Sequence, residues 1–291
     1  MSVTGTIGLI SGVMGEVDQS KYRVFVGLNG YKDLSAAEGE ISLVKLYNKN
    51  HDLMGSAAGD DAICIAAISA TMPEGSKWGW TGDWGYFCGL DFYYSGYEMQ
   101  NSKGLKDVSP HCTWIDNDHT NDFKAAVIGI NWSALHSDSE DTNVPDEATA
   151  RQECGKNMQA WRNWNTEQLL PLPQPKNRRE WGVSDNRLRR RSQRSDNRLV
   201  VSNLAHQNAT ELCAAPNSFG PDFVSVEEGV YCNMETHETA PLCERDNKAP
   251  ECFDHTHPEG PAMVRRNGKR SLRNPTQVIT GGGDKSANAR L

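Results

Sequence analysis

Residues 114–122 form an acidic segment with the side chains of a cation-binding loop. Oxygen-bearing residues fall at alternate positions, as they do in loops that bind calcium: Asp116, Asp118, Thr120 and Asp122. An EF-hand needs glycine at the sixth position and glutamate at the twelfth, where this chain has Asn121 and Val127, so that motif is excluded. Two interpretations stay open: a calcium site of another kind, calcium being the one cofactor suggested, and an ordinary hydrogen-bonded turn.

Acid–base catalysis is a second chemistry that these residues could perform. The Asp118–His119 pair, beside other acids, could support general-base chemistry, and Asp83 or Asp91 could work with a second carboxylate, as in a glycosidase. Any acidic chain of this length offers such pairs. The sequence contains no nucleophile elbow, zinc-protease motif, phosphate-binding loop or dinucleotide-binding glycine motif. We therefore expect a protein without enzymatic activity, with a hydrolase as the alternative.

The aromatic segment 77–94 could bind a sugar. Trp78 and Trp80 are two residues apart, so in a strand they lie on one face, where they could form a stacking platform or fill a core. Tryptophan is usually substantially buried, which favours the core. Trp84 lies in the turn Gly-Asp-Trp-Gly, and we expect it to be the exposed member of the three.

The cysteines indicate disulfides. Four precede the basic segment near residue 190 and four follow it: Cys64, Cys88, Cys112, Cys154, Cys213, Cys232, Cys243 and Cys252. An even number on each side predicts two separately bridged modules, with the pairing within each left open. No Cys-x-x-Cys pair is present, which argues against a zinc ribbon or a thioredoxin motif. Two glycosylation sequons, at Asn131 and Asn208, agree with secretion.

Charge divides the chain of 291 residues, whose net charge is −8. Residues 176–199 hold nine Lys/Arg and three Asp/Glu, and residues 263–291 hold seven bases and one acid. We expect a basic Pro/Arg-rich linker at 171–205 and a disordered basic tail at 261–291, because such segments have little to bury. Because the chain is acidic, we expect no nucleic-acid partner. Because no apolar run is long enough to cross a membrane, we expect no membrane span.

Short β-branched or aromatic runs bounded by turn residues predict about six strands in module 1–145: residues 22–28, 41–47, 62–72, 76–84, 91–99 and 125–132. Apolar residues four, four and three apart predict an amphipathic helix at 146–170 that packs on it: Ala150, Cys154, Met158 and Trp161. The predicted fold is thus mainly β: a small disulfide-stapled β-sandwich, one helix, the basic linker and a small Cys-rich module at 206–260.

Several motifs resemble a group of uncharacterised secreted proteins of filamentous fungi. In the first module these are GDDAICI from Gly59, WGWTGDWG from Trp78, and CTWID followed by DHT from Cys112. In the second they are GPDFVS from Gly220, EGVYC from Glu228 and PLC from Pro241. The resemblance implies secretion, fungal origin and disulfides. It implies no catalytic residue.

We therefore expect a secreted fungal glycoprotein, effector-like, that binds a cell-wall glycan or a host protein. Residues 1–15 fit a secretion signal poorly, because they contain no Lys or Arg; a start further upstream is the preferred explanation. A third possibility is a proprotein that is cleaved to release an active fragment. Dibasic sites that would suit such cleavage end at Arg179, Arg191, Arg266 and Arg270.

Overall fold

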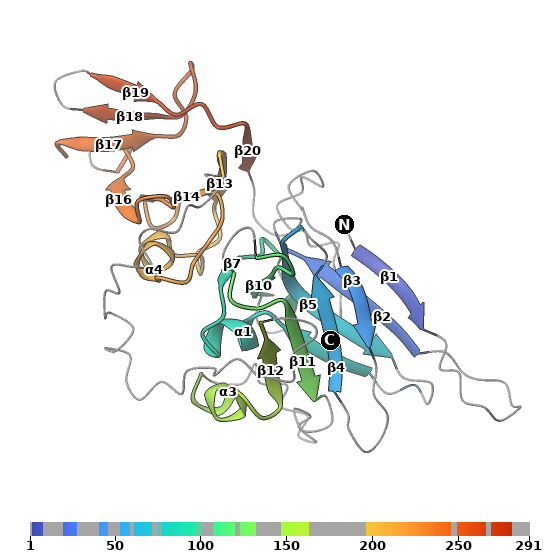
Figure 1. Cartoon of the computed structure of the whole chain (residues 1–291). Helices are drawn as coiled ribbons and strands as arrows, with labels where there is room; N and C mark the ends of the chain where they lie inside the picture. Colours follow the sequence, from blue (N-terminus) through green and yellow to red (C-terminus); the bar gives the residue numbers. More distant parts are fainter. Residues whose placement is uncertain are drawn as a thin grey trace, which may run out of the picture.

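The computed structural model describes residues 2–7, 20–27, 41–45, 53–58, 61–71, 75, 77–97, 99–100, 107–119, 123–131, 147–162, 196–245, 249–265 and 269–280. The fold is mainly β, as predicted (Figure 1). All eight cysteines form disulfides. We call residues 2–162 the first module and residues 196–280 the second. Within the described segments, no helix has the length and apolar character needed to cross a membrane.

The first module contains two main sheets. The larger runs in the order β1 (Ser2–Ile7), β2 (Ser20–Val26), β5 (Ile63–Thr71), β10 (His111–Ile115) and β7 (Phe92–Tyr94), with β6 (Lys77–Thr81) also paired to β5. The smaller runs β12 (Met158–Trp161), β11 (Val127–Asn131), β4 (Leu53–Ala58), β3 (Ile41–Lys45). The described part of this module also contains two short helices and a pair of short strands: α1 (Asp83–Phe87), α3 (Glu147–Glu153), β8 (Met99–Gln100) and β9 (Asp107–Val108).

Strand β5 is apolar on both faces and lies between two cores. Ile63 and Ile65 point into a core that the larger sheet shares with β11, β12 and α3. Ile68 joins the same core, because the register of β5 shifts opposite Phe25 and Val26. Cys64 and Ala66 point the other way, into a core shared with the second module. Because successive side chains of a strand alternate between faces, a continuous apolar run such as this one is typical of a central strand covered on both sides. The larger sheet is therefore the middle of three layers.

The second module is built on a mixed five-stranded sheet. Its order is β16 (Glu238–Pro241), β15 (Val230–Asn233), β14 (Asp222–Ser225), β13 (Arg198–Ser202) and β20 (Gln277–Thr280), with β13 parallel to both neighbours. A three-stranded sheet packs against it, formed by β17 (Glu251–Asp254), β18 (Ala262–Arg265) and β19 (Arg270–Leu272). Tyr231 and Phe253 stack between the two sheets, with 3.8 Å between ring centroids. Helix α4 (Ala209–Ala214) covers the face toward the first module.

The disulfides follow the predicted division into two modules. Cys64–Cys112 and Cys88–Cys154 bridge the first module, and Cys213–Cys232 and Cys243–Cys252 bridge the second. None of the four crosses from one module to the other. Cys88–Cys154 connects the end of α1 to the residue that follows α3, so this bridge ties α3 to the rest of the first module.

The predicted helix at 146–170 is wrong over residues 154–162. Helix α3 ends at Glu153, and Gly155 follows with a φ of +78°, a left-handed conformation that glycine adopts without a steric penalty. The chain then enters β12, which pairs with β11. Met158 is buried as the periodicity predicted, but it is buried from a strand. Residues 163–170 lie outside the described residues.

The predicted linker and the disordered tail are also wrong in part. Strand β13 lies inside the expected linker, and β18, β19 and β20 lie inside the expected tail. Both segments are basic overall, but each contains a short apolar run: Leu-Val-Val at 199–201 and Val-Ile at 278–279. These two runs pair with each other in parallel. The Cys-rich module is therefore larger than the predicted 206–260. Residues 163–195 and 281–291 lie outside the description.

Candidate functional site

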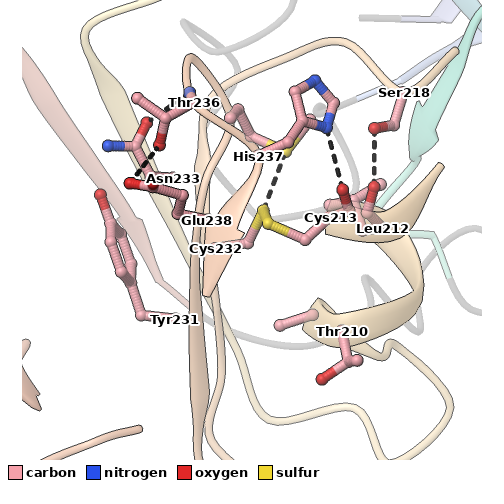
Figure 2. The surroundings of a disulfide bond; sticks show 12 residues. Thr210, Leu212, Cys213, Ser218, Tyr231, Cys232, Asn233, Thr236, His237 and Glu238 are labelled. Atoms are coloured by element: carbon pink, nitrogen blue, oxygen red, sulfur yellow. Dashed lines mark hydrogen bonds between the residues drawn. A yellow bond between two sulfur atoms is a disulfide. The ribbon is translucent and has the colours of Figure 1, made fainter. Parts of the chain in front are cut away.

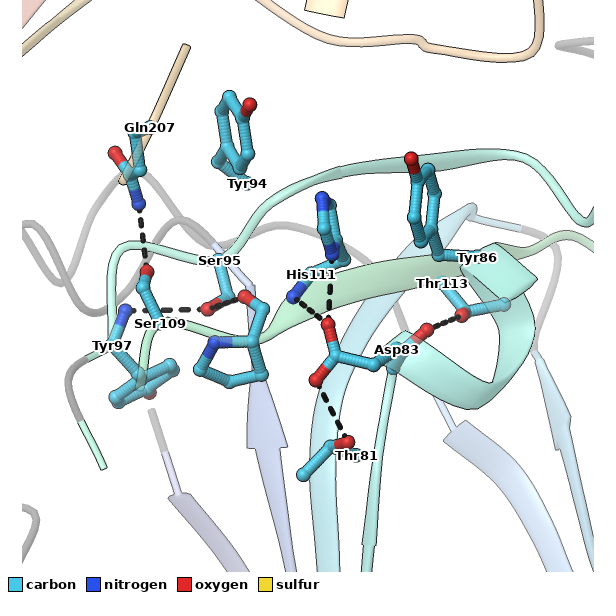
Figure 3. Close-up of polar contacts among 12 residues, drawn as sticks. Thr81, Asp83, Tyr86, Tyr94, Ser95, Tyr97, Ser109, His111, Thr113 and Gln207 are labelled. Atoms are coloured by element: carbon cyan, nitrogen blue, oxygen red, sulfur yellow. Dashed lines mark hydrogen bonds and ion pairs between the residues drawn. The ribbon is translucent and has the colours of Figure 1, made fainter. Parts of the chain in front are cut away.

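An aspartate and a histidine form a hydrogen-bonded pair beside the second module (Figure 3). The Nδ1 atom of His111 lies 2.8 Å from Oδ1 of Asp83, and the His111 backbone N–H donates to the same oxygen at 3.0 Å. Thr81 donates its hydroxyl to Oδ2 at 2.9 Å. The side chains are 11% exposed for Asp83 and 18% for His111, so the pair is largely buried.

Local structure holds the two residues in place. Asp83 is the first residue of α1, which begins directly after β6, and His111 begins β10. A Cβ atom on Gly82 would lie 2.3 Å from the His111 carbonyl oxygen, so only glycine permits this close approach of the α1 start to β10. Thr113 donates its hydroxyl to the Gly82 carbonyl at 2.9 Å.

Aromatic rings enclose the imidazole. Tyr86 stacks on one side of His111, with 4.2 Å between ring centroids and 13° between ring planes, and Tyr94 stacks at 5.3 Å and 28°. Phe92 meets the ring edge-on at 5.2 Å. Figure 3 shows the tips of the two tyrosines and of His111 pointing the same way. This row of polar tips faces the second module.

Both tyrosine hydroxyls bond to residues around helix α4. The Tyr94 hydroxyl donates to the Asn208 carbonyl and accepts the Asn208 backbone N–H, each at 3.0 Å. The Tyr86 hydroxyl donates to Oε1 of Glu211 at 3.0 Å. Burial raises the pKa of the Tyr94 phenol well above its ordinary value, so this group stays neutral at physiological pH. The tyrosines are therefore fastened to the second module.

The Asp83–His111 geometry determines which imidazole atom could react. A carboxylate only accepts hydrogen bonds, so Nδ1 carries a hydrogen in this contact and neutral His111 keeps its lone pair on Nε2. An aspartate that fixes the tautomer in this way is the arrangement used by general-base histidines. The sequence alone points to Asp83 and not to His111, because 28 residues separate the two and no motif links them.

The acidic loop does not form a described metal site. Asp116 is fully buried, whereas Asp118 is exposed; Thr120 and Asp122 lie outside the described residues. Across the described segments, there is no group of three or more His, Cys, Asp or Glu side chains that could hold a metal ion. His119 adopts a left-handed φ of 57° and its Nδ1 lies 3.0 Å from the Phe123 carbonyl oxygen. Calcium binding stays a prediction.

The tryptophans belong to the core. Trp80 is 1% exposed and Trp84 is 9% exposed, so the expectation that Trp84 is exposed in a turn is wrong. Trp84 lies on α1, a single helical turn that packs this ring into the sandwich core. Trp78 packs against the same core and is partly buried, which makes it the most accessible of the three.

The other predicted sites lie in varied surroundings. Asn131 is half-buried at the end of β11, and Asn208 is exposed just before α4. Of the dibasic residues, Arg270 lies in the exposed strand β19, whereas Arg179, Arg191 and Arg266 lie outside the described residues.

No protein-family model matches the chain, and searches of curated proteins and of solved structures found no similar protein. The interpretation of the site therefore depends on its geometry.

Proposed function

We propose that this chain is a secreted fungal protein that acts at a cell wall or host surface by binding a glycan or a protein. The pairing of all eight cysteines in four disulfides carries this proposal. Such bonds form and persist in oxidising compartments, and cytosolic proteins rarely hold four of them. Two sequons and the resemblance to secreted fungal proteins favour the same location.

The contacts of the Asp83–His111 surroundings favour binding over catalysis. Tyr86 and Tyr94, the aromatic neighbours of His111, use their hydroxyls to hold the second module. Because these hydroxyls bond to the second module, the two tyrosines stabilise the arrangement of the modules. A fixed arrangement gives the protein a rigid surface to present to a partner. Among the three predicted tryptophans, only Trp78 is accessible enough to contribute to that surface.

Mass spectrometry of protein from its native source tests the location. We expect the intact, disulfide-bonded chain in the medium or wall fraction. Cytosolic protein with reduced thiols would overturn the proposal. Binding is tested by pull-down on insoluble wall polysaccharides and on a glycan array, with Trp78→Ala as the matched variant. Trp84→Ala is unsuitable as a control, because it removes a core side chain. An absence of binding on every polysaccharide and glycan would overturn the glycan form of the proposal and leave a protein partner.

Hydrolysis is the second candidate function, and the Asp83–His111 hydrogen bond is the observation that favours it. In this role Nε2 of His111 would take a proton from an attacking water, while Asp83 would orient the ring and stabilise the imidazolium. Replacing such a base typically lowers the rate ~10²- to 10⁴-fold.

A screen of wall polysaccharides and ester substrates with wild type, His111→Gln and His119→Gln tests this candidate. Hydrolysis that is lost only in His111→Gln supports it, provided that circular dichroism shows the variant is folded. Wild-type hydrolysis rates in folded His111→Gln would exclude His111 as the base, and loss in His119→Gln would transfer the role to the acidic loop.

A further inference from the structure

We infer that Asn208 carries an N-linked glycan in the mature protein and that Asn131 does not. Both residues begin an Asn-x-Ser/Thr sequon, so the sequence alone treats them alike. The folded structure distinguishes them by exposure and by the use of their side-chain amides. The inference rests on the proposed function, since N-glycosylation requires entry into a secretory pathway.

At Asn208 the hydrogen bond that caps α4 uses the amide oxygen and not the amide nitrogen. The residue is exposed, and its side-chain Oδ1 accepts the backbone N–H of Glu211 at 2.9 Å. A glycan is attached to the other atom, Nδ2, so the modification leaves this hydrogen bond intact. Thr210, which completes the sequon, is also exposed, and Figure 2 shows its side chain directed away from the Cys213–Cys232 disulfide.

At Asn131 the same atom is engaged inside the fold. Nδ2 donates to Oδ1 of Asn157 at 3.0 Å, and the Asn131 backbone N–H donates to the Asn157 carbonyl at 2.9 Å. The side chain is half-buried at the end of β11, a strand with partners on both sides. A sugar on Nδ2 would have to fit into this space beside Asn157. Molecules modified there would fold less well and be depleted from the secreted protein.

The reaction is an ordinary group transfer with a lipid-diphosphate-linked oligosaccharide as the co-reactant. A bond forms between Nδ2 of Asn208 and C1 of the first sugar, and the bond between C1 and the lipid-diphosphate oxygen breaks. The amide gives up one proton, and the lipid diphosphate leaves. No redox change occurs.

The position of Asn208 gives the glycan a structural consequence. The Asn208 backbone N–H and carbonyl both bond to the hydroxyl of Tyr94, whose ring stacks on His111. A glycan on this residue would therefore stand beside the Asp83–His111 site.

The sequon can be tested without changing the Asn208 side chain. The full chain is produced in a eukaryotic secretory host as wild type, Thr210→Ala, Thr210→Ser and Ser133→Ala. Intact mass is measured before and after enzymatic glycan removal, and peptide mapping locates the attachment residue. We expect one glycan on wild type, Thr210→Ser and Ser133→Ala, and none on Thr210→Ala, with secretion and disulfides unchanged.

A secreted, disulfide-bonded protein with no glycan, or with a glycan on Asn131, would overturn this inference and leave the proposed function standing. Native protein found in the cytosol with reduced thiols would overturn the proposed function itself.

Discussion

Trp114 of the first module donates its indole N–H to the backbone carbonyl of Phe219 in the second module, with 2.8 Å between Nε1 and the oxygen. Phe123 stacks on Trp114 at 5.0 Å and meets Phe219 edge-on at 5.4 Å. All three side chains are less than a tenth exposed and belong to one core. The boundary between the modules is therefore built like a protein interior and not like a loose domain contact.

Hydrogen bonds continue along the same boundary. Phe92 accepts the backbone N–H of Phe219 and donates its own to Asn217, each at 3.0 Å, which extends β-type pairing from one module to the other. Asn217 also donates its side-chain amide to the Leu90 carbonyl at 2.7 Å. A Cβ atom on Gly220 would lie 2.6 Å from the Tyr93 ring, so the chain can approach here only as glycine. Since no disulfide crosses, these contacts hold the modules together.

We predict that a chain cut within residues 163–195 stays assembled. With a specific protease site inserted there, the cut protein is expected to elute from a gel-filtration column with the uncut chain. The fragments should separate in SDS without reductant, because the four disulfides lie within modules. Native mass spectrometry gives a second measurement. Separate elution of the two fragments would contradict this prediction. It would instead support the hypothesis of a proprotein that is cleaved to release an active fragment.

Two tyrosines at the module boundary should differ in their contribution to stability. Tyr93 is fully buried and donates its hydroxyl to the Pro221 carbonyl at 2.8 Å, whereas the bond from Tyr86 to Glu211 is exposed. Tyr93→Phe should lower the free energy of unfolding by about 1–3 kcal/mol, because a buried carbonyl loses its partner. Tyr86→Phe is the matched control and should cost less than about 1 kcal/mol. Urea denaturation measures the free energy of unfolding of both variants. Equal losses would show that burial of the hydrogen bond does not determine its contribution to stability.

The disulfides should also contribute unequally. The Cys88–Cys154 bridge spans 66 residues and Cys243–Cys252 spans 9. The entropy of the unfolded chain predicts losses of roughly 4 kcal/mol and roughly 2.5 kcal/mol when each pair is replaced by alanine. Guanidinium denaturation of the two double variants checks the order. A larger loss for the short loop would mean that contacts in the folded state outweigh the entropy term.

Much of the fold was predictable because it depends on local patterns. Strands β5 and β11 lie within predicted runs that are rich in β-branched residues, and the division of the cysteines into two modules followed from their count. Strand β10 was not predicted, although His-Cys-Thr-Trp-Ile is a good strand sequence. The acidic residues that follow this strand are typical of a metal-binding loop, and that pattern masks the strand in the sequence.

The candidate site was not predictable, because it depends on tertiary contacts. Asp83 and His111 meet only because the loop after β6 packs against the start of β10. The strand β20 likewise finds its partner β13 about eighty residues earlier in the chain. Composition predicts a linker around β13 and a disordered tail around β20, whereas two or three apolar residues in each segment are enough for strand pairing once the sheet has formed.

The pH dependence of stability should reveal the environment of Asp222. Its carboxylate accepts the hydroxyl of Tyr231 at 2.5 Å and the backbone N–H of Met234 at 2.9 Å. Burial nevertheless raises the pKa of Asp222, against the opposing effects of these two bonds and of Arg273 at 3.9 Å. The folded protein therefore binds this proton more tightly than the unfolded chain does. The stabilisation is complete below the unfolded pKa, about 3.9, and is lost as pH rises through the folded pKa.

Comparison with Asp222→Asn isolates this contribution, because the variant retains every other titrating group. The free energy of unfolding of wild type, minus that of the variant, should increase as the pH falls from 7 through the carboxyl range. Tyr231→Phe removes a hydrogen bond that lowers the pKa, so in that background the increase should begin at a higher pH. Denaturant titrations at a series of pH values provide the measurement. A difference that decreases toward acid would mean that Tyr231, Met234 and Arg273 outweigh burial and that the carboxylate is stabilised in the fold.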